Sequence, residues 1–268
     1  MWRTSRAVRH IASSRLPSAA TNPCRALSHA AEEAALRYEL AAAHLLQVRS
    51  PGGRLDDLVW NHLSARCPWA PEQFLVTPGS MLFDEIKPDD LVLAGGSTNV
   101  TATVIHSALY EARPDVMAVV HSHAPACMAV SCLKMGLQLL TQDGAGFYGK
   151  VGYHEWEGLS DSDDEKAALG RDLGAAPNHT LVMRNHGVAV VGGSIGQAWV
   201  RGYYLDRVCG VQIDCLPALL ASPSAAVHPP DEVLSHAAAQ VDTEFCHGKY
   251  EWGALLRSVA KETEAWPR

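Results

Sequence analysis

A pair of histidines at the end of an apolar run is the feature that most constrains how this chain folds. The run Val116-Met117-Ala118-Val119-Val120 has the composition of a buried β-strand, and His121-Ser122-His123 follows it directly. Side chains two residues apart in a strand project from the same face, so the two imidazoles converge on one point. We therefore expect a strand that ends in two potential metal ligands.

A third histidine, His186, stands in a similar place. It follows the apolar run Thr180-Leu181-Val182-Met183 and precedes Gly187, which we expect to end the strand and let the backbone turn. Three neutral imidazoles leave one zinc position open for water or substrate, as in catalytic zinc sites. The alternative is unrelated strand-end histidines, because His-x-His is a weak motif alone. The pattern predicts a divalent metal, Zn²⁺ first, with Fe²⁺, Mn²⁺ or Co²⁺ also suited to the donors, on His121, His123 and His186.

Composition limits the class of protein. The chain has 268 residues, of which 47% are hydrophobic, enough for one large α/β domain, and no apolar run of about eighteen residues predicts a membrane span. Its seven cysteines include no Cys-x-x-Cys pair, which argues against a disulfide framework and a cysteine zinc site. Without five arginines near the N-terminus, 22 minus 5 basic residues face 29 acidic ones, so nucleic acid is not an expected partner.

The first 31 residues differ from the rest. They contain those five arginines and several serines, and no acidic residue occurs before Glu32. This composition is typical of an organellar transit peptide and lacks the apolar centre of a secretory signal. We expect residues 1–31 to direct the protein to mitochondria. The alternative is an N-terminal extension without a targeting role, which would leave the protein cytoplasmic.

Periodicity and turn residues predict interleaved helices and short strands. We expect helices at 29–48, 103–112, 126–133, 161–174 and 197–215, and strands at 63–66, 74–77, 91–94, 116–122, 181–184 and 188–191. The proline and serine content of 217–230 predicts a linker before a final helical segment near 231–264. The fold class is therefore α/β, with a mixed sheet covered by helices in a domain spanning 32–217, and with a linker and C-terminal helix in 218–268.

Several separated motifs resemble, in order and spacing, the class II aldolase/adducin family. The resemblance covers about residues 30–217. Asn61-His62 and the start of His106-Ser107-Ala108 look more like its adducin-type branch than like its sugar-phosphate aldolases. It implies a three-layer α/β/α sandwich with a largely antiparallel central sheet, assembled as a homotetramer. The motifs that carry it are Asn61-His62-Leu63-Ser64-Ala65-Arg66, Phe74-Leu75-Val76-Thr77-Pro78-Gly79, Ile86-Lys87-Pro88-Asp89-Asp90-Leu91-Val92, Ala112-Arg113-Pro114-Asp115, the histidine pair and Met183-Arg184-Asn185-His186-Gly187.

The resemblance also implies a reaction. A divalent ion on the three histidines would act as a Lewis acid on a hydroxy-carbonyl substrate and stabilise the enediolate formed when a carbon–carbon bond breaks. The sugar-phosphate aldolases carry a glutamate four residues before the position of His106, and Ala102 stands there in this chain. A proton acceptor must come from elsewhere. The candidates are Tyr148, Tyr153, His154 and Glu155, of which we predict Tyr148, His154 and Glu155 as catalytic, although their segment also has the character of an ordinary strand.

The same family resemblance predicts which residues contact the substrate. The family resemblance implies substrate contacts at Asn61, Ser64, Thr77 and Gly79. The aldolases' Ser-Ser pair is replaced by Val100-Thr101, and valine cannot donate to a phosphate oxygen. This favours a hydroxy or keto acid without phosphate, while the alternative for Asn61 and Ser64 is simple turn closure.

Three functions remain open at this point. The first is a metal-dependent class II aldolase-type lyase for a small hydroxy-carbonyl or keto-acid substrate. The second is an adducin-like binding or scaffold module without turnover, which the missing carboxylate at Ala102 favours. The third is a metal-dependent decarboxylase or oxygenase of the same fold.

Overall fold

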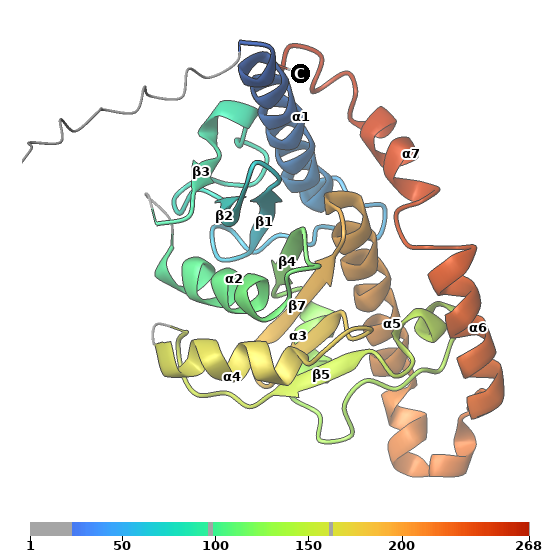
Figure 1. Cartoon of the computed structure of the whole chain (residues 1–268). Helices are drawn as coiled ribbons and strands as arrows, with labels where there is room; N and C mark the ends of the chain where they lie inside the picture. The colour runs from blue at the N-terminus through green and yellow to red at the C-terminus, as the bar shows by residue number, and fades with distance from the viewer. Residues whose placement is uncertain (1–22, 96–98, 161–162, 268) are drawn as a thin grey trace, which may run out of the picture.

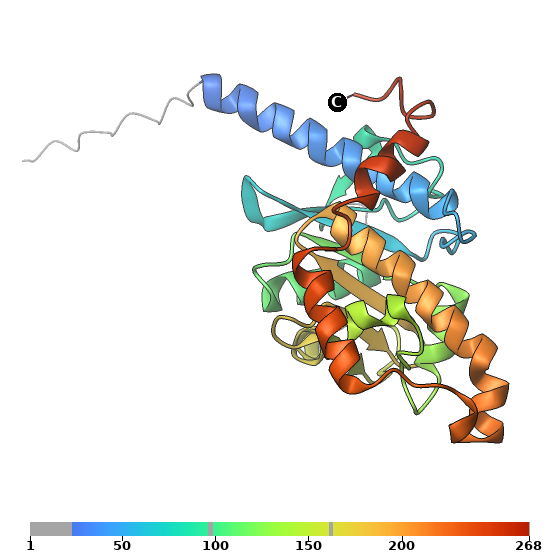
Figure 2. The same cartoon turned by 90° about the vertical axis from the view of Figure 1, so that its right-hand side faces the viewer.

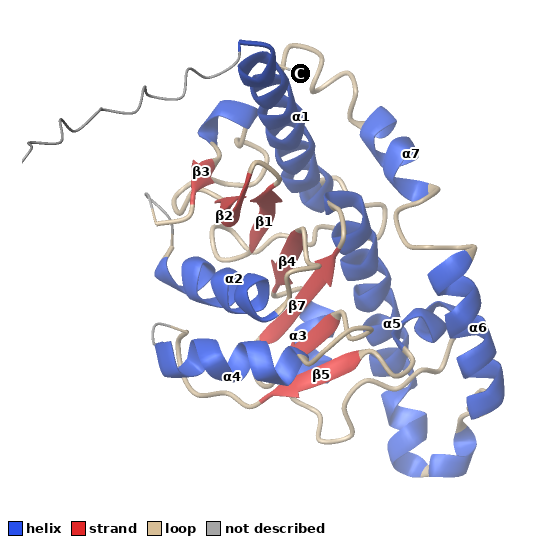
Figure 3. Cartoon of the chain, in the orientation of Figure 1, coloured by secondary structure: helices blue, strands red, loops and turns tan. Residues whose placement is uncertain are grey.

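A seven-stranded sheet forms the centre of the computed structural model, which describes residues 23–95, 99–160 and 163–267. The strand order is β3-β2-β1-β4-β7-β6-β5 (Figures 1 and 3). Five neighbouring pairs are antiparallel and β5 pairs with β6 in parallel, so the predicted mixed, largely antiparallel sheet is confirmed. The strands are β1 (His62–Cys67), β2 (Ala70–Val76), β3 (Val92–Leu93), β4 (Ala118–Ser122), β5 (Val151–His154), β6 (Thr180–Met183) and β7 (Gly187–Gly192).

Helices cover both faces of this sheet, as Figure 1 shows. On one face α1 and α5 pack with alternate residues of β1 and β4, around Leu63, Val120 and Trp199. On the other face α2 and α4 pack on β4, β6 and β7, around Val119 and Leu181. The three-layer α/β/α sandwich is therefore confirmed. The helices are α1 (Pro23–Val48), α2 (Val100–Ala112), α3 (Pro125–Ser131), α4 (Asp163–Leu173), α5 (Ile195–Ala221), α6 (Asp231–Thr243) and α7 (Glu251–Ser258), with short 3-10 turns η1 (Pro88–Asp90), η2 (Gln142–Phe147) and η3 (Pro223–Ala225).

Strand direction brings several histidines to one edge of the sheet. Because β7 is antiparallel to both β4 and β6, the last residues of β4 and β6 lie at the same edge, and the end of β5 joins them through its parallel pairing. β1 starts at this edge, where His62 stands opposite His121. This edge, which we call the histidine edge, therefore brings together side chains from residues 62, 121–123, 154 and 186.

The predicted linker begins later than expected, after Ala221, and extends to Pro230. α5 continues through Pro217 to Ala221, and a final helical region follows as two helices, α6 and α7, instead of one. Proline removes one backbone donor and crowds the turn before it, yet α5 extends by four residues beyond Pro217, and that last turn is largely exposed. The predicted domain boundary at 217 consequently falls inside α5.

The C-terminal segment packs against the rest of the chain. Figure 2 shows α6 and α7 from their own side, with the C-terminus beside α1. Val259 is buried in the core that α1 and α5 share, and Thr263 Oγ1 lies 2.9 Å from the hydroxyl of Tyr38 on α1.

Of the predicted transit peptide, residues 1–22 lie outside the described residues. None of the described helices is long and apolar enough to cross a membrane.

Candidate metal centre

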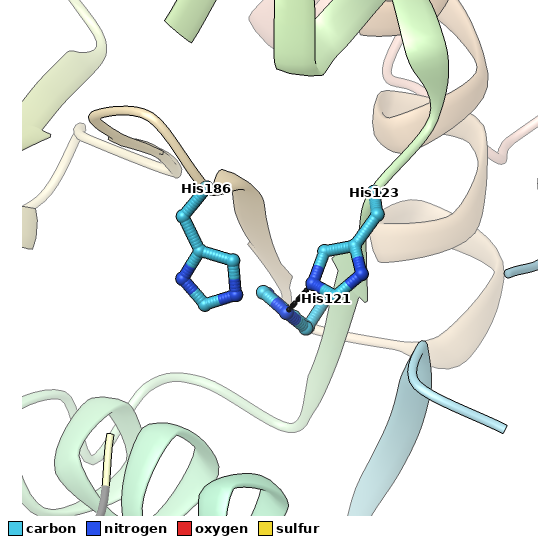
Figure 4. Close-up of side chains that lie close together, drawn as sticks. All are labelled: His121, His123 and His186. Atoms are coloured by element: carbon cyan, nitrogen blue, oxygen red, sulfur yellow. Dashed lines mark hydrogen bonds between the residues drawn. The ribbon is translucent and has the colours of Figure 1, made fainter. Parts of the chain in front are cut away.

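His121, His123 and His186 form a compact cluster at the histidine edge of the sheet. One ring nitrogen from each lies within 4.8 Å of the others, and His121 Nε2 is 2.9 Å from His123 Nε2. Figure 4 shows the three rings turned toward a common point. The structure therefore brings together the three residues that the spacing predicts, two from the end of β4 and one from the turn between β6 and β7.

This arrangement fits a divalent metal. Tetrahedral zinc with bonds of about 2.0–2.1 Å holds its nitrogens roughly 3.3 Å apart, which small side-chain shifts would reach. Burial lowers the pKa of His121 well below its ordinary value, and burial, with neighbouring histidines, lowers the pKa of His186 to about 4. Neutral imidazole is the form that binds metal. Three nitrogens would leave an open position for a substrate oxygen.

The β6–β7 turn positions His186 in a way that the sequence did not reveal. We predicted that Gly187 makes the turn, but Asn185 carries the left-handed backbone, with φ of 57°. Asparagine tolerates this conformation better than most residues. Gly187 is instead needed for close approach, since a Cβ there would stand 2.5 Å from the carbonyl oxygen of Ser122 and 3.2 Å from His123 Cδ2.

Two residues hold His123 in place through hydrogen bonds. Its Nδ1 lies 2.9 Å from Asp57 Oδ2, and its backbone N–H donates to Asn61 Oδ1 over 2.9 Å. An Asp57 carboxylate that accepts the Nδ1 proton leaves Nε2 free for a metal, the carboxylate–histidine arrangement common around metal sites. Asp57 was not predicted, because its partner is 66 positions away and lies close only in the fold.

Asp57→Asn should weaken metal binding by about 10- to 100-fold, the usual loss for a mutated partner of a metal ligand. The amide still accepts a hydrogen bond, but it no longer places a negative charge beside the ring that would hold the ion. A competition titration with a chromogenic chelator measures the change. Asp89→Asn, an exposed carboxylate in η1, is the control. Equal affinity in both variants would remove Asp57 from the site.

The residues predicted for acid–base chemistry are dispersed around this edge. Glu155 is 87% exposed and 4.0 Å from Arg184, and Tyr148 is half-buried before β5. His154 is buried at the end of β5, with Nδ1 2.8 Å from Asp172 Oδ2. Its Nε2 has no hydrogen-bond partner in the described part of the chain. A catalytic role for any of the three stays a prediction.

The predicted substrate-binding residues have structural contacts. The Asn61 amide donates to the Leu55 carbonyl, and Ser64 contacts His106 and Tyr110. Thr77 Oγ1 accepts from the Leu63 N–H over 2.8 Å and lies 2.8 Å from His44 Nε2. Gly79 is half-buried in a loop. These contacts hold the start of β1 in place and do not involve a substrate. Substrate binding by the four residues therefore stays a prediction.

Ala102 lies in the core between α2 and the sheet. It is 1% exposed and packs in the apolar cluster that includes Phe74 and Val76. One turn later along α2, His106 places its Nε2 2.7 Å from Nδ1 of His62, whose ring stacks on His121. At this point the imidazole of His62, which contacts His106, and not a carboxylate, stands beside the candidate ligand His121. Sequence reasoning used His62 and His106 only as marks of family resemblance.

Buried neutral histidines should make the fold sensitive to acid. Burial lowers the pKa of His44 to about 4 and that of His106 to about 3, against about 6.5 when the chain is unfolded. The unfolded chain therefore binds more protons between these values, so the free energy of unfolding falls as pH drops from about 6.5 toward 4, by on the order of 3 kcal/mol per such histidine. Urea unfolding of metal-free protein between about pH 7.5 and 5 measures this. An unchanged midpoint would contradict it.

Comparison with known proteins places the chain in a family. Residues 41–213 match the model described as Class II Aldolase and Adducin N-terminal domain, and the chain belongs to this family. A Pseudomonas aeruginosa protein provisionally named an aldolase class 2 protein is 34% identical over 247 residues, covering 86% of this chain and 91% of the other. Alpha-adducin of Rattus norvegicus is 34% identical over 173 residues, which are 60% of this chain and 23% of that adducin.

Solved structures agree with this assignment. A Pseudomonas syringae aldolase II superfamily protein superposes with a TM-score of 0.77 at 32% identity, covering 88% of this chain and 96% of the other. An L-fuculose 1-phosphate aldolase from Glaciozyma antarctica has a TM-score of 0.72 at 25% identity, covering 95% and 97%. The predicted family and fold are thus confirmed.

Proposed function

We propose that this protein is a metal-dependent lyase of the class II aldolase type that acts on a small hydroxy-carbonyl or keto-acid substrate. The observation that carries the proposal is the cluster of His121, His123 and His186 with Asp57 behind His123, in a chain of the aldolase superfamily. Zinc is the metal we favour, and Fe²⁺, Mn²⁺ or Co²⁺ suit the same nitrogens.

The chain's residues would divide the work as follows. A bound divalent ion supplies Lewis-acid stabilisation of negative charge on substrate oxygens. His121, His123 and His186 hold it, and Asp57 keeps the His123 proton on Nδ1 so that Nε2 faces the ion. Asn61 fixes the backbone of His123. Ala102 packs in the apolar cluster between α2 and the sheet, so it supplies no polar group to the site.

His154 is the best-supported proton acceptor of the three predicted candidates. Asp172 accepts a hydrogen bond from Nδ1 over 2.8 Å, which leaves Nε2 with the lone pair. Nε2 is buried, has no hydrogen-bond partner in the described chain, and is 3.8 Å from Glu165 Oε1. A positioned imidazole with a free nitrogen is suited to general-base work. In the described part of the chain, neither Glu155 nor Tyr148 has a buried hydrogen bond to a carboxylate like the one that His154 makes to Asp172.

A substrate screen with metal-loaded protein tests this proposal. Metal-stripped protein is reconstituted separately with Zn²⁺, Fe²⁺, Mn²⁺ or Co²⁺ and incubated with hydroxy-aldehydes, hydroxy acids and 2-keto acids. Metal-dependent aldehyde or ketone release supports the lyase. Carbon dioxide release or oxygen consumption without aldehyde would instead support the decarboxylase or oxygenase. Absence of turnover with every metal, in protein that binds the ion, would reject the enzyme assignment.

A non-catalytic module is the second candidate. Two observations favour it: Ala102 stands where the aldolases carry a glutamate, and the chain is 34% identical to part of an adducin. In that case the histidine cluster would hold an ion, or pack, without turnover. The screen above separates the two, because only the lyase releases product.

Assembly and location are further proposals. The family resemblance supports a homotetramer, which light scattering of the purified chain would measure. The arginine-rich residues 1–31 support mitochondrial targeting. A fluorescent protein fused after residues 1–35 should therefore collect in mitochondria, and a fusion with the five arginines replaced by glutamine should not. Diffuse signal from the unmodified fusion would contradict the targeting.

A further inference from the structure

A buried chain of polar side chains runs from α2 to the metal ligand His121. The Tyr110 hydroxyl lies 2.8 Å from Ser64 Oγ, and Ser64 Oγ contacts His106 Nδ1. His106 Nε2 is 2.7 Å from His62 Nδ1. The His62 ring then stacks on His121, with ring centroids 4.5 Å apart and an interplanar angle of 22°. All five side chains are at most 4% exposed.

The direction of the hydrogen bonds follows from counting protons. Burial raises the pKa of Tyr110, so its hydroxyl stays protonated and needs an acceptor, and Ser64 Oγ is the acceptor present in the described chain. The single hydroxyl proton of Ser64 must then go to His106 Nδ1. Burial keeps His106 neutral, so its one ring proton lies on Nε2 and is donated to His62 Nδ1.

The same count of protons determines which ring nitrogen of His62 carries the proton. Its Nδ1 accepts from His106 and therefore carries a lone pair, so the ring proton of His62 lies on Nε2. The reverse direction would leave the buried Tyr110 hydroxyl proton without an acceptor in the described structure, which is the costlier state. A protonated Nε2 cannot bind a metal. This explains why His62 is not a fourth ligand, although its imidazole lies beside the three candidate ligands.

The geometry points to His62 as a hydrogen-bond donor of the proposed centre: its Nε2–H donates to an oxygen of a substrate held at His121, His123 and His186. Nε2 is the ring atom remote from the backbone and from His106, and it has no hydrogen-bond partner in the described chain. A neutral imidazole N–H that polarises a substrate oxygen is an established catalytic arrangement. Ser64, His106 and Tyr110 are positioning residues, since they act through His62.

This inference rests on the proposed metal centre, but its first test does not need metal. Protein with ¹⁵N-labelled histidine rings, assigned with His62→Gln and His106→Gln, is studied by long-range ¹H–¹⁵N correlation NMR. We expect the proton on Nε2 in both rings. Tyr110→Phe, which removes the hydroxyl that sets the direction, should make a second ring form of His62 detectable. A wild-type His62 protonated on Nδ1 would overturn the inference.

The second test measures a substrate mimic. Acetohydroxamate binds metals through two oxygens and is titrated into Co²⁺-loaded protein by visible absorption. His62→Leu should weaken its binding by about 10- to 100-fold, the factor for one hydrogen bond to a charged group, with Co²⁺ affinity within about threefold of wild type. His62→Gln, which keeps an N–H donor, should restore most of it. His179→Leu, a buried histidine at the opposite edge of the sheet, is the control.

The outcomes separate this inference from the proposed function. If wild type binds Co²⁺ but His62→Leu binds acetohydroxamate as wild type does, the donor role fails and the lyase proposal stands. If wild type binds no metal, the lyase proposal fails, and with it the donor role. Should His62→Leu not fold, the NMR measurement on wild type and Tyr110→Phe decides the inference.

Discussion

Replacing His121 and His123 together with alanine is expected to lower bound metal from about one ion per chain to below about one in ten. The variant keeps only His186, and a single imidazole does not hold a divalent ion through purification. Both proteins are reconstituted with zinc, iron, manganese or cobalt, passed through gel filtration and analysed by mass spectrometry for metal. Any metal-dependent turnover should disappear in parallel.

The matched control removes two histidines that lie on the surface. His228 and His236 are exposed near α6 and away from the cluster, so His228→Ala/His236→Ala should retain wild-type metal content. A melting curve confirms that each variant is folded. Equal metal in wild type and the His121/His123 variant would end the catalytic interpretation of the cluster.

Gly187→Ala should destabilise the fold and disturb the candidate metal site, although it adds only one methyl group. Its Cβ would stand 2.5 Å from the Ser122 carbonyl oxygen and press on the ring of His123 at 3.2 Å. The end of β4 must then move, at a cost of about 1–3 kcal/mol in the free energy of unfolding, and metal affinity should fall with it because His123 is displaced.

Gly193→Ala provides the comparison for this change. A Cβ there would meet only Gln197 Oε1, at 3.5 Å, an ordinary contact distance. Urea unfolding and chelator competition on both variants give the two differences. If Gly187→Ala is as stable as Gly193→Ala and binds metal equally well, the close approach of β7 to Ser122 does not position the ligand.

The layers and the histidine edge could be predicted because they depend on local patterns. Two apolar runs, each followed within three residues by a histidine, predict two strand ends, and antiparallel pairing with β7 brings these ends together. Element boundaries were less predictable. Asn99 caps α2 through the Thr101 N–H, so this helix begins at Val100, three residues before the position expected from periodicity. Pro217 was interpreted as a break, but α5 continues past it to Ala221.

The partners of the histidines could not be predicted, because they depend on contacts between distant segments. Asp57 reaches His123 from a loop 66 positions earlier, and His106 reaches His62 across 44 positions. No spacing rule links these pairs. Position 102 is a related case. The sequence shows a missing carboxylate, whereas the fold shows the imidazole of His62 between His106 and the candidate ligand His121.

A crystal structure of the zinc-loaded protein, with anomalous diffraction measured on both sides of the zinc absorption edge, would decide whether the three histidines hold the metal. We expect one strong anomalous peak about 2.0–2.1 Å from one ring nitrogen each of His121, His123 and His186, with Asp57 still on His123 Nδ1 and a non-protein ligand in the fourth position. A peak that includes His62 as a ligand, or no peak at the three histidines in protein saturated with zinc, would contradict it.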